Sequence, residues 1–342
     1  MNWSEYEAAI RRACREIHGI PPDRTRLLLE RARRLYDQEL PVILDQKNLA
    51  WFLGFDISLV MCIANRPHKY YRCFRIPKRN GGFRELHEPL PTLKEMQRVI
   101  LDLILARLPV DPAAKAYQPG SSVKDNANFH TRQPLLLKLD VSDFFGSLRE
   151  YQVYQVFHGV GYHPQVATLL AKLTCLNGSL PQGAPTSPTL SNLIFREADQ
   201  RIFHFCRQAN IRYTRYADDL TFSGDFKPGL VIRRVASVIE TLGLRLNPEK
   251  TRVIRRHRRQ EVTGVLVNNG LRAARSRRMH LRQQLYYLSR FGLADQAAKH
   301  GTKTHLWINH LLGLAGYIRF LDPSDREAAR AIAMLKTLRG ST

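Results

Sequence analysis

Three aspartates in the sequence are placed where they could bind a divalent cation. Asp218 and Asp219 are adjacent within an alternating stretch, 211–222, that predicts two strands joined by a tight turn. Neighbouring carboxylates repel each other, and a bound cation would reverse that cost. Asp140 ends a separate apolar run, 135–139, that predicts a buried strand. If these strands are neighbours in one sheet, Asp140 supplies a third carboxylate.

Such a group of carboxylates suits phosphoryl transfer. Magnesium takes oxygen ligands and is usually held by one or two carboxylates plus substrate phosphates. Two such ions, about 3.5–4 Å apart, can activate an attacking hydroxyl and stabilise the leaving oxygen. The alternative is a solvated Asp-Asp turn without a ligand, and a pattern this short arises by chance in about one chain in ten. The acidic pair alone does not decide between these interpretations.

The acidic pair belongs to an ordered series of motifs. The series consists of the basic turn PKRNGG at 77–82, LDVSDFF at 139–145, QGAPTSP at 182–188, YADD at 216–219 and NPEK at 247–250. This order resembles the fingers and palm motifs of reverse transcriptases, over about 70–268, more than half of the chain.

The resemblance implies an α+β right-hand polymerase, whose palm is an antiparallel sheet packed on helices. Helical spacing of apolar residues also predicts helices at both ends of the chain. We therefore expect an N-terminal helical region at 1–66, fingers at 67–137 with a contribution from 151–190, a palm at 138–268, and a basic helical thumb at 269–342.

The resemblance also implies roles for the acidic group and its neighbours. It assigns metal binding to Asp140, Val141, Asp218 and Asp219, with the three aspartates acting in catalysis. Asp143 is a further carboxylate, more typical of a structural or surface position. Lys250 matches the motif whose lysine can protonate the leaving pyrophosphate, although a solvated surface lysine would look the same. The implied cofactor is Mg²⁺, two ions per active site, with Mn²⁺ as a substitute.

Nucleotide-binding residues follow from the same resemblance. They are Lys78, Arg84, Phe145, Gln182, Gly183 and Tyr216. Lys78 and Arg84 match the fingers cations that hold the triphosphate; the alternative is an exposed basic hairpin. Phe145 matches the aromatic gate, whose ring penalises a ribose 2′-hydroxyl, and the alternative is a core phenylalanine. Beside Gln182, the missing side chain of Gly183 would let the backbone approach the substrate.

Two short motifs resemble those of bacterial retron reverse transcriptases. Asn126 and His130 fit an N-A-x-x-H pattern, and Val262, Thr263 and Gly264 form a V-T-G triplet. The resemblance places all five in RNA binding, although His130 could be an ordinary partly buried histidine. The 78 residues after the triplet suffice for a thumb and are too few for the maturase and endonuclease regions of a group II intron protein.

The charge of the chain predicts a polyanionic partner. The 342 residues include 53 Lys+Arg and 30 Asp+Glu, a net charge of +23. The segment 250–290 holds twelve basic residues and one acid, Glu261. Its candidate phosphate-binding residues are Arg255, Arg256, Arg258, Arg259, Arg275, Arg277, Arg278 and Arg282. A solvated basic surface is the alternative, but such a density of arginine, which makes forked phosphate contacts, favours a ligand.

The retron resemblance implies the partners. They are a structured non-coding RNA that serves as template and primer, dNTPs, an RNA–DNA hybrid product, and a toxin or effector protein in anti-phage defence. In that family synthesis starts from the 2′-hydroxyl of an internal guanosine and gives branched RNA–DNA. Two alternatives remain: a group II intron-like, diversity-generating or other phage-defence reverse transcriptase, and an RNA-binding protein with an inactive palm.

Composition excludes several other classes. With 44% hydrophobic and 24% charged residues, the chain is not predominantly disordered. The longest apolar stretch, about 51–64, is too short to span a bilayer, so we expect a cytoplasmic bacterial protein without a membrane partner. Five widely spaced cysteines support neither a disulfide framework nor a structural zinc site, and we expect buried, reduced thiols.

Overall fold

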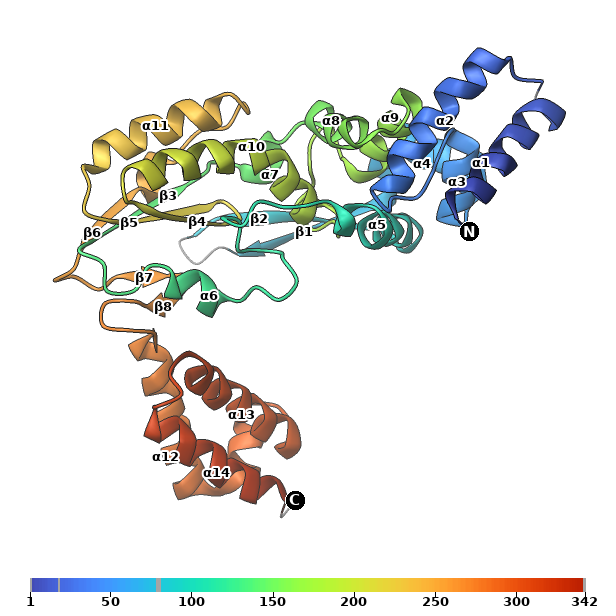
Figure 1. Ribbon diagram of the computed structural model, residues 1–342. Coiled ribbons are helices and arrows are strands. Elements are labelled where there is room, and N and C mark those ends of the chain that lie inside the picture. The colour runs from blue at the N-terminus through green and yellow to red at the C-terminus, as the bar shows by residue number, and fades with distance from the viewer. Residues whose placement is uncertain (1, 18, 78–80, 341–342) are drawn as a thin grey trace.

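The computed structural model describes residues 2–17, 19–77 and 81–340. Figure 1 shows a group of N-terminal helices at one end, a central sheet with helices on one face, and a separate bundle of helices that carries the C-terminus. The expected α+β architecture with a helical C-terminal part is therefore confirmed.

Helices form the N-terminal region, as predicted. They are α1 (Trp3–Arg12), a π-helical turn (Ala13–Ile17), α2 (Pro22–Asp37), α3 (Gln46–Leu53) and α4 (Ile57–Asn65). Asp45 caps α3 by accepting from the Asn48 N–H, and Gly54 ends it with φ 79°. No single helix among the described residues is long and apolar enough to cross a membrane; α3 and α4 pass that test only as a pair bent by 99°.

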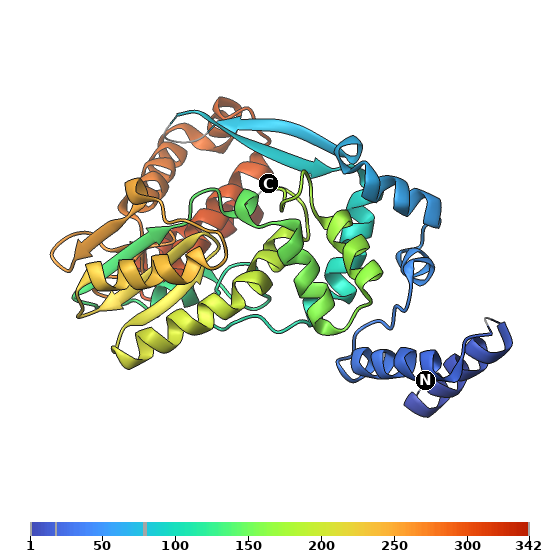
Figure 2. The same ribbon diagram turned by 90° about the horizontal axis from the view of Figure 1, so that it is seen from above.

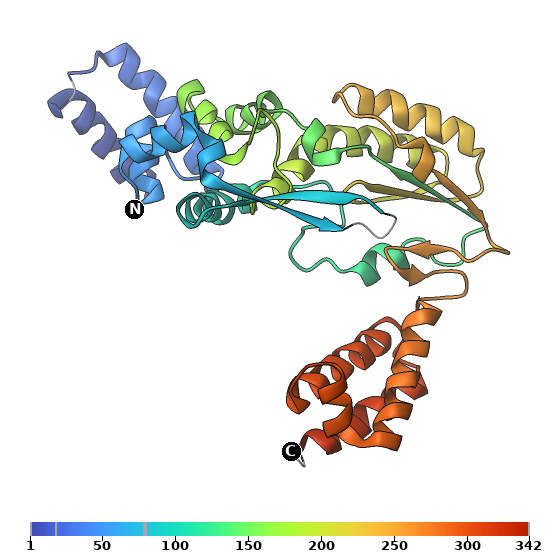
Figure 3. The same ribbon diagram turned by 180° about the vertical axis from the view of Figure 1, so that it is seen from behind.

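A long hairpin follows, in which β1 (Tyr71–Pro77) pairs antiparallel with β2 (Phe83–Pro89). Figures 2 and 3 show it extending from the N-terminal helices towards the central sheet. Lys78, predicted to bind the triphosphate, follows β1 in the sequence and lies outside the described residues. After the hairpin come α5 (Pro91–Leu103), a 3₁₀ turn (Leu105–Arg107) and α6 (Val123–Asn128).

The central sheet has four antiparallel strands in the order β4-β5-β3-β6. They are β3 (Leu135–Asp140), β4 (Arg212–Tyr216), β5 (Asp219–Gly224) and β6 (Arg252–Arg255). The predicted buried strand before Asp140 and the predicted strand pair around the acidic turn are confirmed. The boundary expected between 137 and 138 falls within β3, because residues 135–137 pair with β5 and β6.

Helices connect and cover these strands. They are α7 (Phe144–Ser147), α8 (Glu150–Val160), α9 (Pro164–Thr174), α10 (Ser187–Gln208) and α11 (Pro228–Glu240). Helices α8 and α9 are separate, because Gly161 ends α8 with φ 121° and Pro164 starts α9. Helices α10 and α11 lie together on one face of the sheet (Figure 1).

Alternation along the strands gives the sheet two chemically different faces. Leu137 and Leu139 of β3, with Leu220 and Phe222 of β5, belong to the main apolar core beneath α10 and α11. The residues that alternate with them point to the other face, and these include Lys138 and, at the end of β3, Asp140. The same alternation that buries the leucines therefore directs the acidic residue away from the core.

The chain beyond this sheet forms a small sheet and the C-terminal bundle. The strands are β7 (Glu261–Val262), β8 (Val265–Leu266) and β9 (Arg272–Ala273), and the helices are α12 (Arg275–Lys299), α13 (Thr304–Leu321) and α14 (Arg326–Gly340). Gly292, with φ 78°, interrupts α12. A second apolar core joins Leu136 of β3 to the small sheet, α13 and α14. The bundle is thus anchored on the face of the central sheet opposite α10 (Figure 1).

All five cysteines are free thiols, but they are not all buried. Cys14, Cys175 and Cys206 lie inside the protein, as predicted. The prediction is wrong for Cys62 on α4 and Cys73 on β1, which are exposed.

Candidate active site

The three predicted carboxylates meet at one end of the central sheet. Antiparallel pairing of β3 with β5 places Asp140 directly opposite Asp219. Asp218 lies in the turn between β4 and β5, and its backbone carbonyl accepts a 3.1 Å bond from the N–H of Val141. The condition set by the sequence, that the two strands be neighbours, is therefore met.

Burial makes this acidic group costly without a cation. The pKa of Asp218 is raised, first by loss of solvent and then by repulsion from Asp219 and Asp140. Loss of solvent also raises the pKa of Asp219, and Asp140 adds to that shift while Lys138 and Lys250 oppose it. The side-chain donors are all carboxylate oxygens, which is the set that Mg²⁺ or Mn²⁺ prefers. The residues present therefore fit a divalent metal centre.

Lys250 lies against the acidic group. Its Nζ donates to both carboxylate oxygens of Asp140 at 2.9 Å, and this bond raises the pKa of Lys250. The lysine is brought there by a 3₁₀ turn (Pro248–Lys250), which Asn247 caps by accepting from the Glu249 N–H. The backbone N–H of Asn247 donates to the Asp140 carbonyl oxygen at 2.8 Å. Lys250 is therefore held at the site, as its predicted role requires.

A cleft of about 1100 Å³ opens beside the carboxylates. Its walls come from the β1–β2 hairpin, the end of β3 with α7, and the loop before α10. Among the predicted site residues it is lined by Arg84, Asp140, Val141, Phe145, Gln182, Asp218 and Lys250. Phe145 is half-buried and packs edge-on against Phe144, with ring centroids 5.4 Å apart. Asp143 is exposed and lines the same cleft, away from the paired carboxylates.

Two predicted nucleotide-binding residues do not line this cleft. Tyr216 is half-buried and pairs with Asp219 in the sheet. Gly183 is required by the protein itself: its φ is 122°, and an added Cβ would lie 2.9 Å from the His87 carbonyl oxygen. The proposed reason for this glycine, close approach to substrate, is therefore corrected. The close approach is to β2, where the His87 N–H donates to the Gln182 carbonyl oxygen at 2.8 Å.

Sequence reasoning missed Tyr117 as a residue of the cleft. Its ring lines the cleft, it is 47% exposed, and Asp218 and Arg84 both act electrostatically on its hydroxyl. Its backbone has φ 60°, a left-handed conformation that is costly for a residue with a Cβ. The Pro119-Gly120 pair predicts a turn here, but nothing in the sequence places that turn beside the carboxylates.

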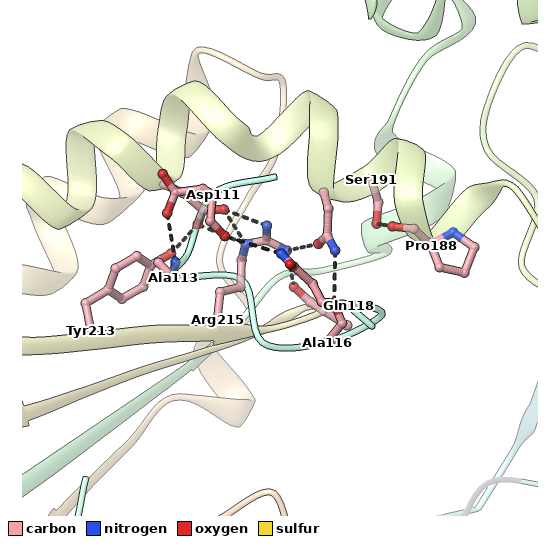
Figure 4. Close-up of polar contacts among 11 residues, drawn as sticks. Asp111, Ala113, Ala116, Gln118, Pro188, Ser191, Tyr213 and Arg215 are labelled. Carbon is pink, nitrogen blue, oxygen red and sulfur yellow. Dashed lines mark hydrogen bonds and ion pairs between the residues drawn. The ribbon is translucent and has the colours of Figure 1, made fainter. Parts of the chain in front are cut away.

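On the other face of the sheet, Arg215 points towards α10 and forms a buried ion pair (Figure 4). Arg215 of β4 is fully buried and donates to Asp199 of α10 through Nη2 at 2.6 Å and Nε at 2.9 Å. Tyr213 also donates to Asp199, at 2.7 Å, and Phe195 packs on the guanidinium at 4.4 Å. Such a pair is stable in the interior only because its remaining hydrogen bonds are made.

The same ion pair connects the acidic turn to the segment that carries Tyr117. Arg215 Nη1 donates at 3.1 Å to the carbonyl oxygen of Ala217, which has φ 58° and directly precedes Asp218. Nη1 also donates to Asn192, whose amide donates in turn to the carbonyl oxygen of Ala116 at 2.9 Å. Two backbone bonds further join Arg215 to the segment 113–115. Arg215 is thus a positioning residue for both walls of the site.

The N-A-x-x-H and V-T-G motifs meet inside the protein. His130 is fully buried, with Nδ1 2.7 Å from the Ser223 hydroxyl and Nε2 2.8 Å from the Thr214 hydroxyl. Asn126, also buried, accepts from Thr214 at 2.6 Å and donates to Thr263 at 3.5 Å. These residues dock α6 on the central and small sheets.

The prediction of RNA contacts is therefore wrong for three residues of these motifs. Asn126, His130 and Val262 have no exposed surface. Thr263 and Gly264 are half-buried, with φ 47° and 82°, and form the two-residue turn between β7 and β8. A possible contact of that turn with RNA stays a prediction.

The predicted RNA-binding arginines divide into two groups. Arg255, Arg256, Arg258 and Arg275 are exposed. Others bind parts of this chain: Arg282 forms a forked pair with Glu327 at 2.6 and 2.8 Å, Arg278 lies 3.3 Å from Asp325, Arg259 pairs with Glu261, and Arg277 covers the Tyr317 ring. Three of the α12 arginines, Arg277, Arg278 and Arg282, thus already have partners within the C-terminal bundle. Exposed pairs contribute little to stability and can exchange partners with a phosphate.

Comparisons with known proteins identify the family. A family model for "Reverse transcriptase (RNA-dependent DNA polymerase)" matches residues 76–268. The retron Mx65 reverse transcriptase of Myxococcus xanthus is 35% identical, over 94% of this chain and 77% of its own length. This chain belongs to the bacterial retron reverse transcriptases. The retron Ec83 reverse transcriptase of Escherichia coli is 31% identical, over 79% of this chain and 88% of its own.

The enzyme is therefore an RNA-directed DNA polymerase of the retron type, and the motif-based prediction is confirmed. Solved structures are more distant. A foamy viral protease–reverse transcriptase in complex with double-stranded DNA is 14% identical, over 80% of this chain and 39% of its own, with a TM-score of 0.46. An apo telomerase from Candida tropicalis is 16% identical, over 64% of this chain and 61% of its own, with a TM-score of 0.44. Likenesses this remote add nothing to the assignment.

The Arg215 ion pair gives a first prediction. Arg215→Met should lower the free energy of unfolding by about 3–5 kcal/mol, because Asp199 is left buried and unpaired. The double variant with Asp199→Asn should recover most of that loss, since no buried charge remains. Both variants should lose DNA synthesis, because the Ala217 carbonyl is no longer held. Urea unfolding and a primer-extension assay check this. An active double variant would contradict the positioning role.

Protonation of His130 gives a second prediction. Burial lowers its pKa from 6.5 to about 3. Between these values the unfolded chain binds a proton that the folded chain does not. The contribution of the neutral His130 to stability is therefore fully present above pH 6.5 and decreases as the pH is lowered. Between pH 7.5 and 5.0 the free energy of unfolding should fall by about 2 kcal/mol more in the wild type than in His130→Gln. Equal decreases in paired urea titrations would contradict a buried neutral imidazole.

Proposed function

We propose that this reverse transcriptase copies part of a bound, structured non-coding RNA into single-stranded DNA, with two divalent metal ions held by Asp140, Asp218 and Asp219. The observation that carries the proposal is the acidic group itself: three carboxylates, two with raised pKa values, at the edge of the cleft. Reverse transcriptases use divalent metal ions, and the oxygen-only donor set favours Mg²⁺, with Mn²⁺ as a substitute. Val141 would add its backbone carbonyl.

The residues of the cleft divide the work of nucleotide addition. Metal ions bound here would stabilise the charge that develops on the attacking and leaving oxygens. Arg84, together with Lys78, would hold the triphosphate. Gln182 and the Phe145 ring would enclose the sugar, and the ring would exclude a ribose 2′-hydroxyl by steric clash. Lys250, already protonated beside Asp140, would donate a proton to the leaving pyrophosphate.

The basic surface supplies the RNA contact. Arg255 and Arg256 follow β6, next to β3 in the central sheet, and Arg258 lies three residues further on. Counterion release from phosphates bound here would make RNA affinity fall steeply with salt. By likeness to the retron reverse transcriptases, we propose that this RNA is both template and primer, that priming uses a 2′-hydroxyl, and that the product is branched RNA–DNA ending in an RNA–DNA hybrid.

The cellular setting follows from the same likeness. We propose a role in the bacterial cytoplasm, in anti-phage defence, together with a toxin or effector protein.

Substitution of the acidic turn tests the polymerase site. Asp218→Asn and Asp219→Asn should each lower Mg²⁺-dependent dNTP incorporation by more than about 100-fold. Loss of a direct metal ligand should cost more than loss of an outer-shell partner, which costs about 10–100-fold. The matched control is Asp225→Asn, which changes an exposed aspartate just beyond the far end of β5 and should retain activity. RNA affinity should be unchanged in all three, measured by filter binding. Full synthesis by either turn variant would contradict the assignment.

The nucleic acid bound in cells tests the retron product. The gene, expressed with its native flanking DNA, should yield a purified protein that carries single-stranded DNA joined to RNA. Treatment with RNase should shorten this molecule, and a debranching enzyme should release a linear DNA. Recovery of a linear DNA with no RNA joined to it, or of no DNA, would contradict the branched product. The polymerase assignment would still be tested separately, by primer extension on supplied templates.

A further inference from the structure

A second group of metal-ligating side chains lies on the β1–β2 hairpin. In the antiparallel register Cys73 faces His87, and Arg75 faces Glu85. The Leu90 N–H donates to the Tyr70 carbonyl oxygen, so alternation makes Cys73 and His87 a non-hydrogen-bonded pair, the kind in which facing side chains lie closest. Glu85 lies two residues before His87 on β2, and thus on the same face.

These three side chains converge. The Cys73 thiol, a Glu85 carboxylate oxygen and a His87 ring nitrogen all lie within 4.8 Å of one another. Ligand atoms of a tetrahedral zinc site are about 3.3–3.6 Å apart, given Zn–ligand bonds of about 2.0–2.3 Å. Cys73 and Glu85 are exposed and His87 is half-buried, so small side-chain rotations can close that difference.

We propose that Cys73, Glu85 and His87 form a zinc-binding site on this hairpin. The sulfur, nitrogen and oxygen donors suit Zn²⁺, whereas Mg²⁺ takes oxygen ligands. Arg75 donates both of its bonds to Oε1 of Glu85, so the second oxygen, Oε2, can bind the ion. Binding displaces the thiol proton to the buffer and leaves a fourth position for water.

Zinc at this hairpin would act on the neighbouring cleft. Glu85 and His87 line the cleft together with Arg84 and Gln182, and the His87 N–H donates to the Gln182 carbonyl oxygen. An ion joining β1 to β2 would fix these residues in one arrangement and place positive charge beside the triphosphate site. We therefore infer that zinc bound here slows nucleotide incorporation. This second part rests on the proposed function of the cleft, whereas zinc binding itself does not.

Cobalt substitution tests binding without any assay of activity. The full chain, titrated with Co²⁺ under reduction, should show a thiolate-to-cobalt charge-transfer band that saturates at one ion per chain and disappears when Zn²⁺ is added. Cys73→Ser should abolish the band. Cys62→Ser, which removes the other exposed cysteine, should retain it. Absence of the band in the wild type, or its persistence in Cys73→Ser, would overturn the zinc site.

Inhibition tests the second part. Cys73 does not line the cleft, so Cys73→Ser should synthesise DNA normally with Mg²⁺. Half-inhibition of this variant should need more than about tenfold more Zn²⁺ than the wild type, since losing a ligand costs more than losing an outer-shell partner. Equal inhibition of both would overturn the inhibitory role, because the zinc would then act elsewhere. A wild-type chain that binds cobalt but makes no DNA would contradict the proposed function and leave the zinc site standing.

Discussion

Repulsion among three carboxylates is the constraint around which this enzyme is arranged. Asp140 and Asp219 face each other across two paired strands, and Asp218 lies in the adjoining turn. Burial raises the cost of that charge, which Lys250 and Lys138 offset in part. A chain free to relax would separate such groups. The structure keeps them together because the strand register is fixed by the leucines and Phe222 on the opposite face, which a one-residue slip would expose.

The acidic turn needs a second restraint, and Arg215 provides it from the core face. Alternation along β4 sends Tyr213 and Arg215 towards α10, while Thr214 and Tyr216 point the other way. The guanidinium can therefore reach Asp199, Asn192 and the Ala217 carbonyl at once. An ion pair this deep adds little net stability over apolar packing. Its role is positional, because its hydrogen bonds hold the acidic turn and the strained segment before α6 in place relative to α10.

Features set by short-range pattern were predictable from sequence, and those set by long-range pairing were not. The apolar run before Asp140 and the alternation around the acidic turn specify strands and their ends. Nothing in the local sequence distinguishes the buried Arg215 from a surface arginine. The polar residues next to His130 are typical of an exposed site, although the imidazole is buried between two strands. The roles of Gly183 and Cys73 could not be predicted for the same reason, because the residues that each contacts lie on a separate strand, β2.

Docking of α6 explains why two motifs far apart in sequence belong together. Asn126 joins Thr214 of the central sheet to Thr263 of the small sheet, and His130 joins β4 to β5. The small sheet shares its apolar core with the C-terminal helices and follows directly on the arginines after β6. Because α6 binds both sheets, the basic surface and the carboxylates are held in one frame. The two motifs thus act through the fold, by fixing the distance from the exposed arginines after β6 to the acidic end of β3.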